Sequence, residues 1–137
     1  MTFRVVLDTG AVLAYAAGSV NVGALIVELV DEQAQFLIPN LVLLEAAAEL
    51  TPPPAERLRR ATPDGLRLLD VLVSHRSGRV SSFGADDWRE TAPAIALFGS
   101  AGRAVAAVAA AYGVARYVVT TDPGPYRREG LDAITVV

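Results

Sequence analysis

The chain has 137 residues and is 53% hydrophobic, which fits one globular domain with a sizeable core and excludes a disordered chain. Its formal charge is −3 and all its basic residues are arginines, so it lacks the broad basic field of non-specific nucleic-acid binders. Without cysteine there is no disulfide, thiol nucleophile or cysteine metal site. The apolar runs are too short to span a bilayer and no secretory pattern opens the chain, so we expect a cytoplasmic protein with no membrane contact.

The amino-terminal part alternates short apolar runs with helical patterns. The expected elements are a buried strand at 3–7, an alanine-rich helix at 11–18, an amphipathic helix at 21–33, a strand at 36–38 ended by Pro39, and a helix at 41–50. The proline run at 52–54 ends that helix, because proline lacks the amide donor that a helix needs.

The alternation continues to the end of the chain. The expected elements are a short basic segment at 55–60, a helix from 62 to about 75, a strand at 79–83, helices at 85–98 and 101–112, a strand at 117–121, a turn at 124–125 and a final strand at 133–137. Strands alternating with helices predict a parallel sheet covered on both faces. We therefore expect an α/β fold: a single-domain α/β/α sandwich over residues 1–137 with four or five strands.

Three carboxylates are expected to meet at one edge of this sheet. Asp8 and Asp122 each follow the end of a strand, and Glu45 lies near the start of the helix after the second strand. The carboxyl ends of parallel strands are where α/β sheets bind ligands. Oxygen ligands without histidine or cysteine suit Mg²⁺ or Mn²⁺, which can activate water for attack on a phosphodiester. The pattern therefore indicates a hard-cation site.

Each of these acids also has a plainer interpretation. Asp8 can cap the helix that follows it, and Asp122 before Pro123 can form an Asx turn. Glu45 competes with Glu49, which lies one turn further along the same helix face.

Three segments together resemble a known family. They are Val-Val-Leu-Asp-Thr-Gly-Ala-Val-Leu-Ala-Tyr at 5–15, Ile-Pro-Asn-Leu-Val-Leu-Leu-Glu at 38–45 and Val-Val-Thr-Thr-Asp at 118–122. In this order, and over almost the whole chain, they are similar to the PIN domain, the metal-dependent nuclease fold of VapC-type toxins. The resemblance implies a parallel sheet flanked by helices and Mg²⁺ or Mn²⁺ bound by the three acids. It also implies cleavage of single-stranded RNA, and often a homodimer paired with a small antitoxin.

One position departs from that family. Members that resemble this chain carry another aspartate at the start of the helix before the last central strand, ahead of a run of the form Ala-x-Ala-Val-Ala. Ser100 stands there instead, as a helix cap or a residual ligand. Arg103 follows one turn later, where it can pair with Asp8 or Asp122 and compete with the metal.

Both changes predict weak metal binding. We therefore expect a metal-dependent endoribonuclease of the PIN/VapC type with weakened activity. The alternative is a catalytically silent PIN-like domain that serves as a protein- or RNA-binding module.

Other residues are secondary candidates. Thr9 and Thr121 stand beside the acids and can position water or the ligands. Arg57, Arg59 and Arg60 form a basic cluster that can contact RNA phosphates or simply make a solvated face.

A last group of residues has structural interpretations. Asp86 and Asp87 are expected in the first turn of their helix, where the helix dipole favours acids, and Trp88 to pack that helix or serve at a partner interface. His75 is expected at a helix end. The small residues of 101–112 suit close helix packing, within the fold or across a dimer.

Missing residues exclude four other α/β families. A haloacid-dehalogenase-type phosphatase needs an aspartate where Gly10 stands, and receiver domains and P-loops need a lysine that the chain lacks. No Gly-x-Gly-x-x-Gly follows a strand, so dinucleotide binding has no support.

Overall fold

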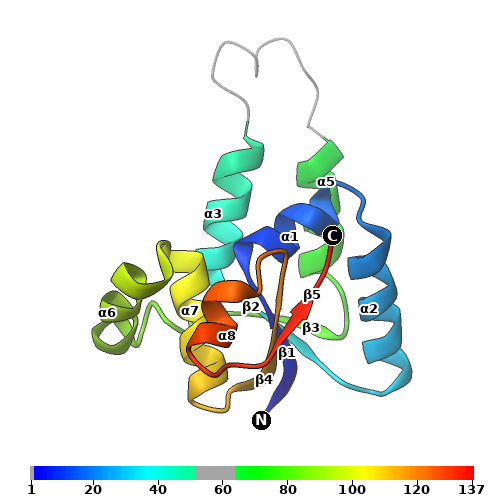
Figure 1. The fold of residues 1–137 in the computed structure, drawn as a ribbon. Helices are drawn as coiled ribbons and strands as arrows, with labels where there is room; N and C mark the ends of the chain where they lie inside the picture. The colour runs from blue at the N-terminus through cyan, green and yellow to red at the C-terminus, as the bar shows by residue number, and fades with distance from the viewer. Residues whose placement is uncertain (1, 52–63) are drawn as a thin grey trace.

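The computed structural model describes residues 2–51 and 64–137, which form a five-stranded parallel sheet between two layers of helices (Figure 1). The strands are β1 (Phe3–Leu7), β2 (Phe36–Pro39), β3 (Gly78–Ser81), β4 (Ala115–Thr120) and β5 (Ala133–Thr135). The helices are α1 (Thr9–Ala16), α2 (Val20–Asp31), α3 (Asn40–Leu50), α5 (Asp64–Val73), α6 (Trp88–Phe98), α7 (Ala101–Ala111) and α8 (Gly124–Arg128). The α/β sandwich with a parallel sheet is thus confirmed.

Strand β1 is the centre of the sheet, whose order is β3-β2-β1-β4-β5. It pairs with β2 on one side and with β4 on the other, with Leu7 opposite Val119. Because β1 and β4 are parallel neighbours, the acids that follow them, Asp8 and Asp122, leave the sheet at the same edge. The topology therefore brings together two residues that are far apart in the sequence.

The residues of β1 alternate between two hydrophobic clusters, as expected for a strand that is covered on both faces. Val5 and Leu7 pack in a cluster that includes residues of α1, α2, α3 and α5. Val6 packs in the other cluster, with residues of α6, α7 and α8. All three side chains are buried, so β1 is fixed from both sides. The carboxylate that follows it starts from a rigid position.

The alanine-rich helix α7 packs inside the fold. Its residues from Ala104 to Ala109 are all buried within the single chain. Their small side chains let α7 lie close to the sheet, where it contacts β4, β1 and β2. Close packing within the chain thus accounts for the small residues of this helix.

A sharp corner between α6 and α7 directs α7 at the carboxyl edge of the sheet. Gly99 ends α6 in the left-handed conformation, with φ of 86°, which favours glycine. Ser100 then caps α7, accepting a hydrogen bond from the Arg103 amide at 3.2 Å. The two helices are bent by 116° at this corner, so the amino terminus of α7 lies beside the acids.

Several predicted element boundaries were wrong. Helix α1 begins at Thr9, two residues earlier than expected, because Asp8 caps it, and β4 begins at Ala115 rather than at 117. Strand β3 ends at Ser81, and α6 begins only at Trp88.

The later start of α6 changes the roles of its flanking acids. Asp86 and Asp87 precede the helix instead of lying in its first turn; Asp86 accepts a hydrogen bond from Ser82, at 2.6 Å. Trp88, at the first position, is 57% exposed with Arg89 stacked over its ring at 4.4 Å, so it does not pack the helix into the core.

The segment at 124–125 was expected to be a plain turn, but it begins the short helix α8. The arginine cluster of 57–60 lies outside the described residues. Among the described helices, none is individually long and apolar enough to cross a membrane; two bent pairs, α1 with α2 and α6 with α7, reach that length and composition only when joined.

Candidate functional site

A cleft of about 400 Å³ lies at the carboxyl edge of the sheet. It is lined by Asp8, Thr9, Gly10, Leu13, Glu45, Glu49, Gly99, Ser100, Arg103, Thr120 and Thr121. The lining comes from the ends of β1 and β4 and from helices α1, α3 and α7. Six of the residues predicted from the sequence line this cleft, namely Asp8, Thr9, Glu45, Ser100, Arg103 and Thr121, and Asp122 lies one position beyond the lining.

Asp8 is buried, with 1% of its surface exposed, and both of its carboxylate oxygens have donors. Its Oδ1 accepts the Ala11 amide at 2.9 Å and so caps α1. Its Oδ2 accepts the hydroxyl of Tyr126 at 2.7 Å. The capping interpretation of Asp8 is thus observed, together with a second bond that the sequence did not indicate.

Tyr126 comes from α8 and is completely buried behind the cleft. Its ring stacks on Phe98, with 5.6 Å between centroids. Burial, and then the negative charge of Asp8, raise the pKa of the Tyr126 phenol far above its usual range. The phenol therefore stays protonated and remains a donor to Asp8.

Glu45 points to the amino terminus of α7. Its Oε1 accepts the backbone amide of Gly102 and the hydroxyl of Thr9, the latter at 3.2 Å. The positive end of the helix dipole favours a carboxylate at this position. A Cβ on residue 102 would overlap both Thr9 Oγ1 and Glu45 Oε1, so this approach requires glycine.

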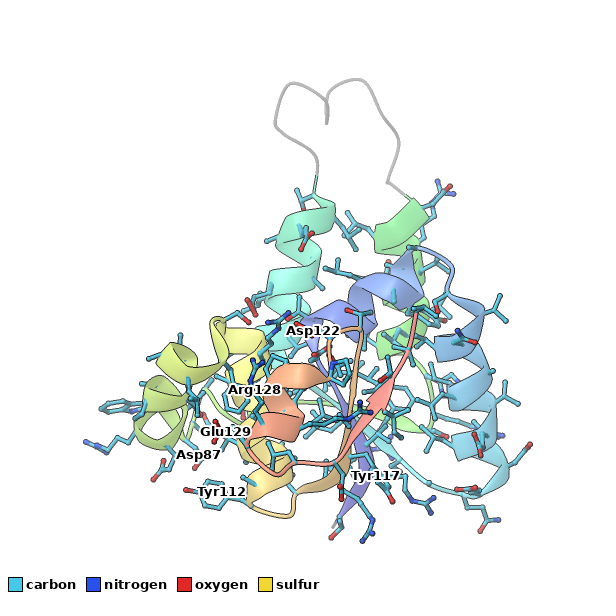
Figure 2. All side chains as sticks on the ribbon, viewed as in Figure 1. Asp87, Tyr112, Tyr117, Asp122, Arg128 and Glu129 are labelled. Atoms are coloured by element: carbon cyan, nitrogen blue, oxygen red, sulfur yellow. The ribbon has the colours of Figure 1, made fainter. Side chains whose placement is uncertain are left out.

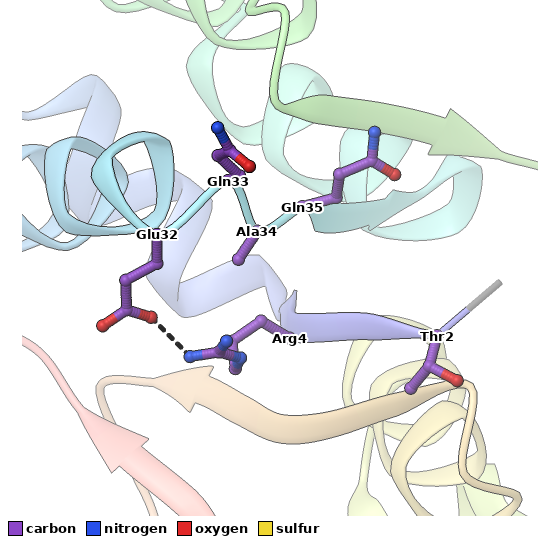
Figure 3. A pocket seen from close by; sticks show the side chains of 6 residues that line it. All are labelled: Thr2, Arg4, Glu32, Gln33, Ala34 and Gln35. Atoms are coloured by element: carbon purple, nitrogen blue, oxygen red, sulfur yellow. Dashed lines mark hydrogen bonds and ion pairs between the residues drawn. The ribbon is translucent and has the colours of Figure 1, made fainter.

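Asp122 is the most exposed of the three acids and pairs with Arg103. The guanidinium Nη2 lies 3.1 Å from Asp122 Oδ2, and the two side chains are 38% and 53% exposed. The backbone amide of Asp122 donates to Thr120 Oγ1 at 3.0 Å. Figure 2 labels Asp122 near the middle of the view, just beyond the end of β4. Of the two ion pairs considered for Arg103, the structure forms the one with Asp122.

The remaining predicted positions have local contacts. Ser100 caps α7, and Thr9 donates to Glu45. Thr121 packs against Gly10, where a Cβ would lie 2.6 Å from its Oγ1. Glu49 lines the cleft one turn beyond Glu45, so both acids of α3 face it.

The donor atoms suit a divalent cation by type, but their arrangement does not fit one. Mg²⁺ requires several oxygens at about 2.0–2.1 Å in octahedral geometry, each offering a free lone pair. Each of the three acids already accepts from the chain: Asp8 from Tyr126, Glu45 from Gly102, and Asp122 from Arg103. Among residues 2–51 and 64–137, no group of three acids or histidines is placed to hold a metal ion.

Sequence reasoning missed two residues of this site, Tyr126 and Gly102. Tyr126 lies in a helix of five residues, too short to show a helical period, and the preceding Gly-Pro indicates a turn. Gly102 interrupts an otherwise alanine-rich helix, where glycine costs about 1 kcal/mol relative to alanine and so indicates a packing or functional reason. That second signal was available.

The fold has relatives among solved structures. The structure of VapBC2 from Rickettsia felis, bound to a DNA fragment from their promoter, contains a chain with a TM-score of 0.65 at 15% identity. The match covers 98% of this chain and 100% of that one. PAE2754 from Pyrobaculum aerophilum matches with a TM-score of 0.64 at 21% identity, over 97% of this chain and 92% of the other. No protein-family model and no curated protein sequence matches the chain.

At these identities the likeness concerns the fold alone, and it agrees with the resemblance that the three sequence motifs indicated. The five-stranded parallel sheet, its order and its helical layers are those of a PIN-like domain. The chain therefore has a PIN-like fold.

Proposed function

We propose that this protein is a VapC-type PIN domain that works by binding a partner protein, and that its acidic cleft does not catalyse RNA cleavage. The observation that carries the proposal is that Asp8, Glu45 and Asp122 all accept hydrogen bonds from the chain itself. The acids that the sequence resemblance assigns to a metal site are thus each bound to a donor from another part of the chain.

The physical argument concerns what a metal ion would have to displace. Clustered carboxylates repel one another, and a divalent cation normally relieves that repulsion. Here the guanidinium of Arg103 and the phenol of Tyr126 relieve part of it, and the helix dipole of α7 stabilises Glu45. A metal ion would have to compete with the Arg103 guanidinium for Asp122, and the hydrogen bonds to Asp8 and Glu45 already fix the orientations of these carboxylates. Both effects weaken metal binding.

The partner that best suits the proposal is a small antitoxin-like protein. The neighbour from Rickettsia felis is a VapBC2 complex bound to promoter DNA, which supports a partnered role for this fold. A homodimer and a cytoplasmic setting belong to the same proposal, following the sequence resemblance.

The direct test has two parts. Calorimetry measures the binding of Mn²⁺, and a separate assay measures cleavage of unstructured and structured RNA in the presence of Mn²⁺. We expect weak Mn²⁺ binding and no cleavage by the wild type. The variant Ser100→Asp with Arg103→Gln restores the missing carboxylate and removes the competing cation, and aspartate still caps α7. We expect this variant to bind Mn²⁺ at least about tenfold more tightly, a gain of about 1.4 kcal/mol.

The control for this test is Asp8→Asn, in the wild type and in the double variant. RNA cleavage by the wild type that disappears with Asp8→Asn would overturn the proposal. Unchanged Mn²⁺ affinity in the double variant would show that Ser100 and Arg103 are not what weakens the site.

The second candidate function is the weakened Mg²⁺- or Mn²⁺-dependent endoribonuclease. The observation in its favour is that the Arg103–Asp122 pair is only half-buried. Exposed ion pairs contribute about 0–1 kcal/mol, so opening this one costs little. Asp8 and Tyr126, by contrast, are fully buried and hold their bond more firmly, which is why we rank the binding role first.

A further inference from the structure

A second surface, remote from the acidic cleft, has the features of a protein-docking site. Two adjoining hollows of about 290 and 280 Å³ lie over α6 and α7 and share Glu90, Val108 and Tyr112 as lining residues. Together we call them the α6–α7 groove. Its apolar lining includes Leu97 and Tyr112, which are 60% and 67% exposed. Covering these exposed apolar side chains with a binding partner would remove apolar surface from water, which is favourable.

The rim of the α6–α7 groove is acidic. Asp87 immediately precedes α6, Glu90 lies in its first turn, and Glu129 follows α8. All three are exposed, and Figure 2 shows Asp87 and Glu129 on the same side of the molecule as Tyr112. Within the described part of the chain, no lysine or arginine lines either hollow. The residues that line the groove thus combine apolar side chains with charged side chains of one sign.

This combination selects the chemistry of its occupant. We infer that the α6–α7 groove binds an amphipathic helical segment of a partner protein, with aliphatic side chains flanked by lysine or arginine. The aliphatic residues would cover Leu97 and Tyr112. The basic residues would pair with the rim acids Asp87, Glu90 and Glu129. The inference rests on the proposed function, because it names the surface and chemistry by which the domain would take a protein partner.

The charge of the rim makes other occupants poor candidates. RNA and anionic membranes carry negative charge and would be repelled by three exposed carboxylates. A second copy of the chain, docking the same surface on itself, would bring the same acids together across the symmetry axis. A basic protein segment is the occupant that satisfies both the apolar floor and the acidic rim.

The test uses a synthetic helical peptide of leucine and lysine, with leucines at the i, i+3, i+4 and i+7 positions of an amphipathic helix. A matched peptide with glutamate in place of lysine is the probe control. Trp88, the single tryptophan, follows the lining residue Asp87 in the sequence, so its fluorescence is a first readout of binding. Amide chemical shifts from NMR then locate the bound peptide on the full-length protein.

We expect saturable binding of the basic peptide, with shifts confined to α6, α7 and the end of α8, and none of the acidic peptide. The variant Leu97→Ser with Glu90→Gln should weaken binding at least about tenfold, as expected at the centre of an interface. The control variant is Val27→Ser with Glu28→Gln on α2, because Val27 is exposed to the same 60% as Leu97. It should leave binding unchanged.

Equal loss of binding in both variants, or shifts spread over α2 and α5, would overturn the inference, since general attraction to an acidic protein would then explain the binding. Tighter binding of RNA or of anionic vesicles than of the basic peptide at this groove would also overturn it. The Mn²⁺ and RNA-cleavage assays test the proposed function separately. Metal-dependent cleavage together with peptide binding at the groove would refute the proposed function alone.

Discussion

Replacing Tyr126 with phenylalanine is the sharpest single test of how the acidic cleft is held together. The substitution removes one oxygen and leaves the aromatic ring, its stacking on Phe98 and its place in the core. The lost atom is the donor to Asp8 Oδ2, at 2.7 Å, in a position that water does not reach. The variant therefore isolates one hydrogen bond to a buried carboxylate.

The expected cost follows from that burial. A hydrogen bond to a charged group contributes about 1.5–3 kcal/mol, and a buried acceptor left without its donor carries its full desolvation penalty. Asp8 would keep only the Ala11 amide. We expect Tyr126→Phe to lower the free energy of unfolding by about 2–3 kcal/mol at pH 7. For a domain of this size, that corresponds to a fall of about 6–12 °C in Tm.

The measurement is urea-induced unfolding at pH 7, without added metal. Tyr112→Phe is the matched control, because Tyr112 is exposed and its hydroxyl is not buried against a carboxylate. A double-mutant cycle with Asp8→Asn should give a coupling energy of at least about 1 kcal/mol. A loss of less than about 0.5 kcal/mol in Tyr126→Phe, with the coupling near zero, would refute the bond as a determinant of stability.

Three further predictions concern the stability of the acidic cleft, with one control position in α2. Gly102→Ala should lower the free energy of unfolding by about 1–2 kcal/mol, because the new methyl group displaces Glu45. Gly23→Ala, at an open helical position, should raise the free energy of unfolding by about 0.4–1 kcal/mol in the same urea assay. Arg103→Gln alone should change the free energy of unfolding by less than about 1 kcal/mol at low salt, because the Arg103–Asp122 ion pair is partly exposed to solvent. The raised pKa of Tyr126 means that its contribution to stability is complete below about pH 10, the unfolded value, and falls by about 1.4 kcal/mol per pH unit above it. The free energy of unfolding, measured from pH 8 to pH 11, should therefore fall less steeply above pH 10 in Tyr126→Phe than in the wild type. The difference in slope should correspond to one proton.

Much of the architecture could be predicted from the sequence, because the patterns that carry it are local. The apolar run of β1 indicated a strand covered on both faces, and the alternation of strands and helices indicated a parallel sheet. A parallel sheet in turn placed Asp8 and Asp122 at one edge. Element ends were less predictable where a cap decides them, as at Thr9, where Asp8 starts α1 two residues early.

The short helix α8 is the clearest failure of local reasoning. Five residues beginning with Gly124 and Pro125 carry no periodic signal, and they were interpreted as a turn. Tertiary packing decides their conformation, because Tyr126 fills a space between Phe98 and Asp8. When contacts with residues far away in the sequence determine a conformation, the neighbouring residues carry little signal that predicts it.

The sequence by itself determined the fold class, the positions of the acids along the chain and the presence of Ser100 where the family resemblance implies an aspartate. Only the tertiary structure decided which partner each acid has. Tyr126 lies 118 positions from Asp8, and Gly102 lies 57 positions from Glu45. Hydrophobic periodicity and helix caps are properties of neighbouring residues, whereas the hydrogen bonds that satisfy a buried carboxylate depend on elements that meet only when the sheet and its helices have assembled.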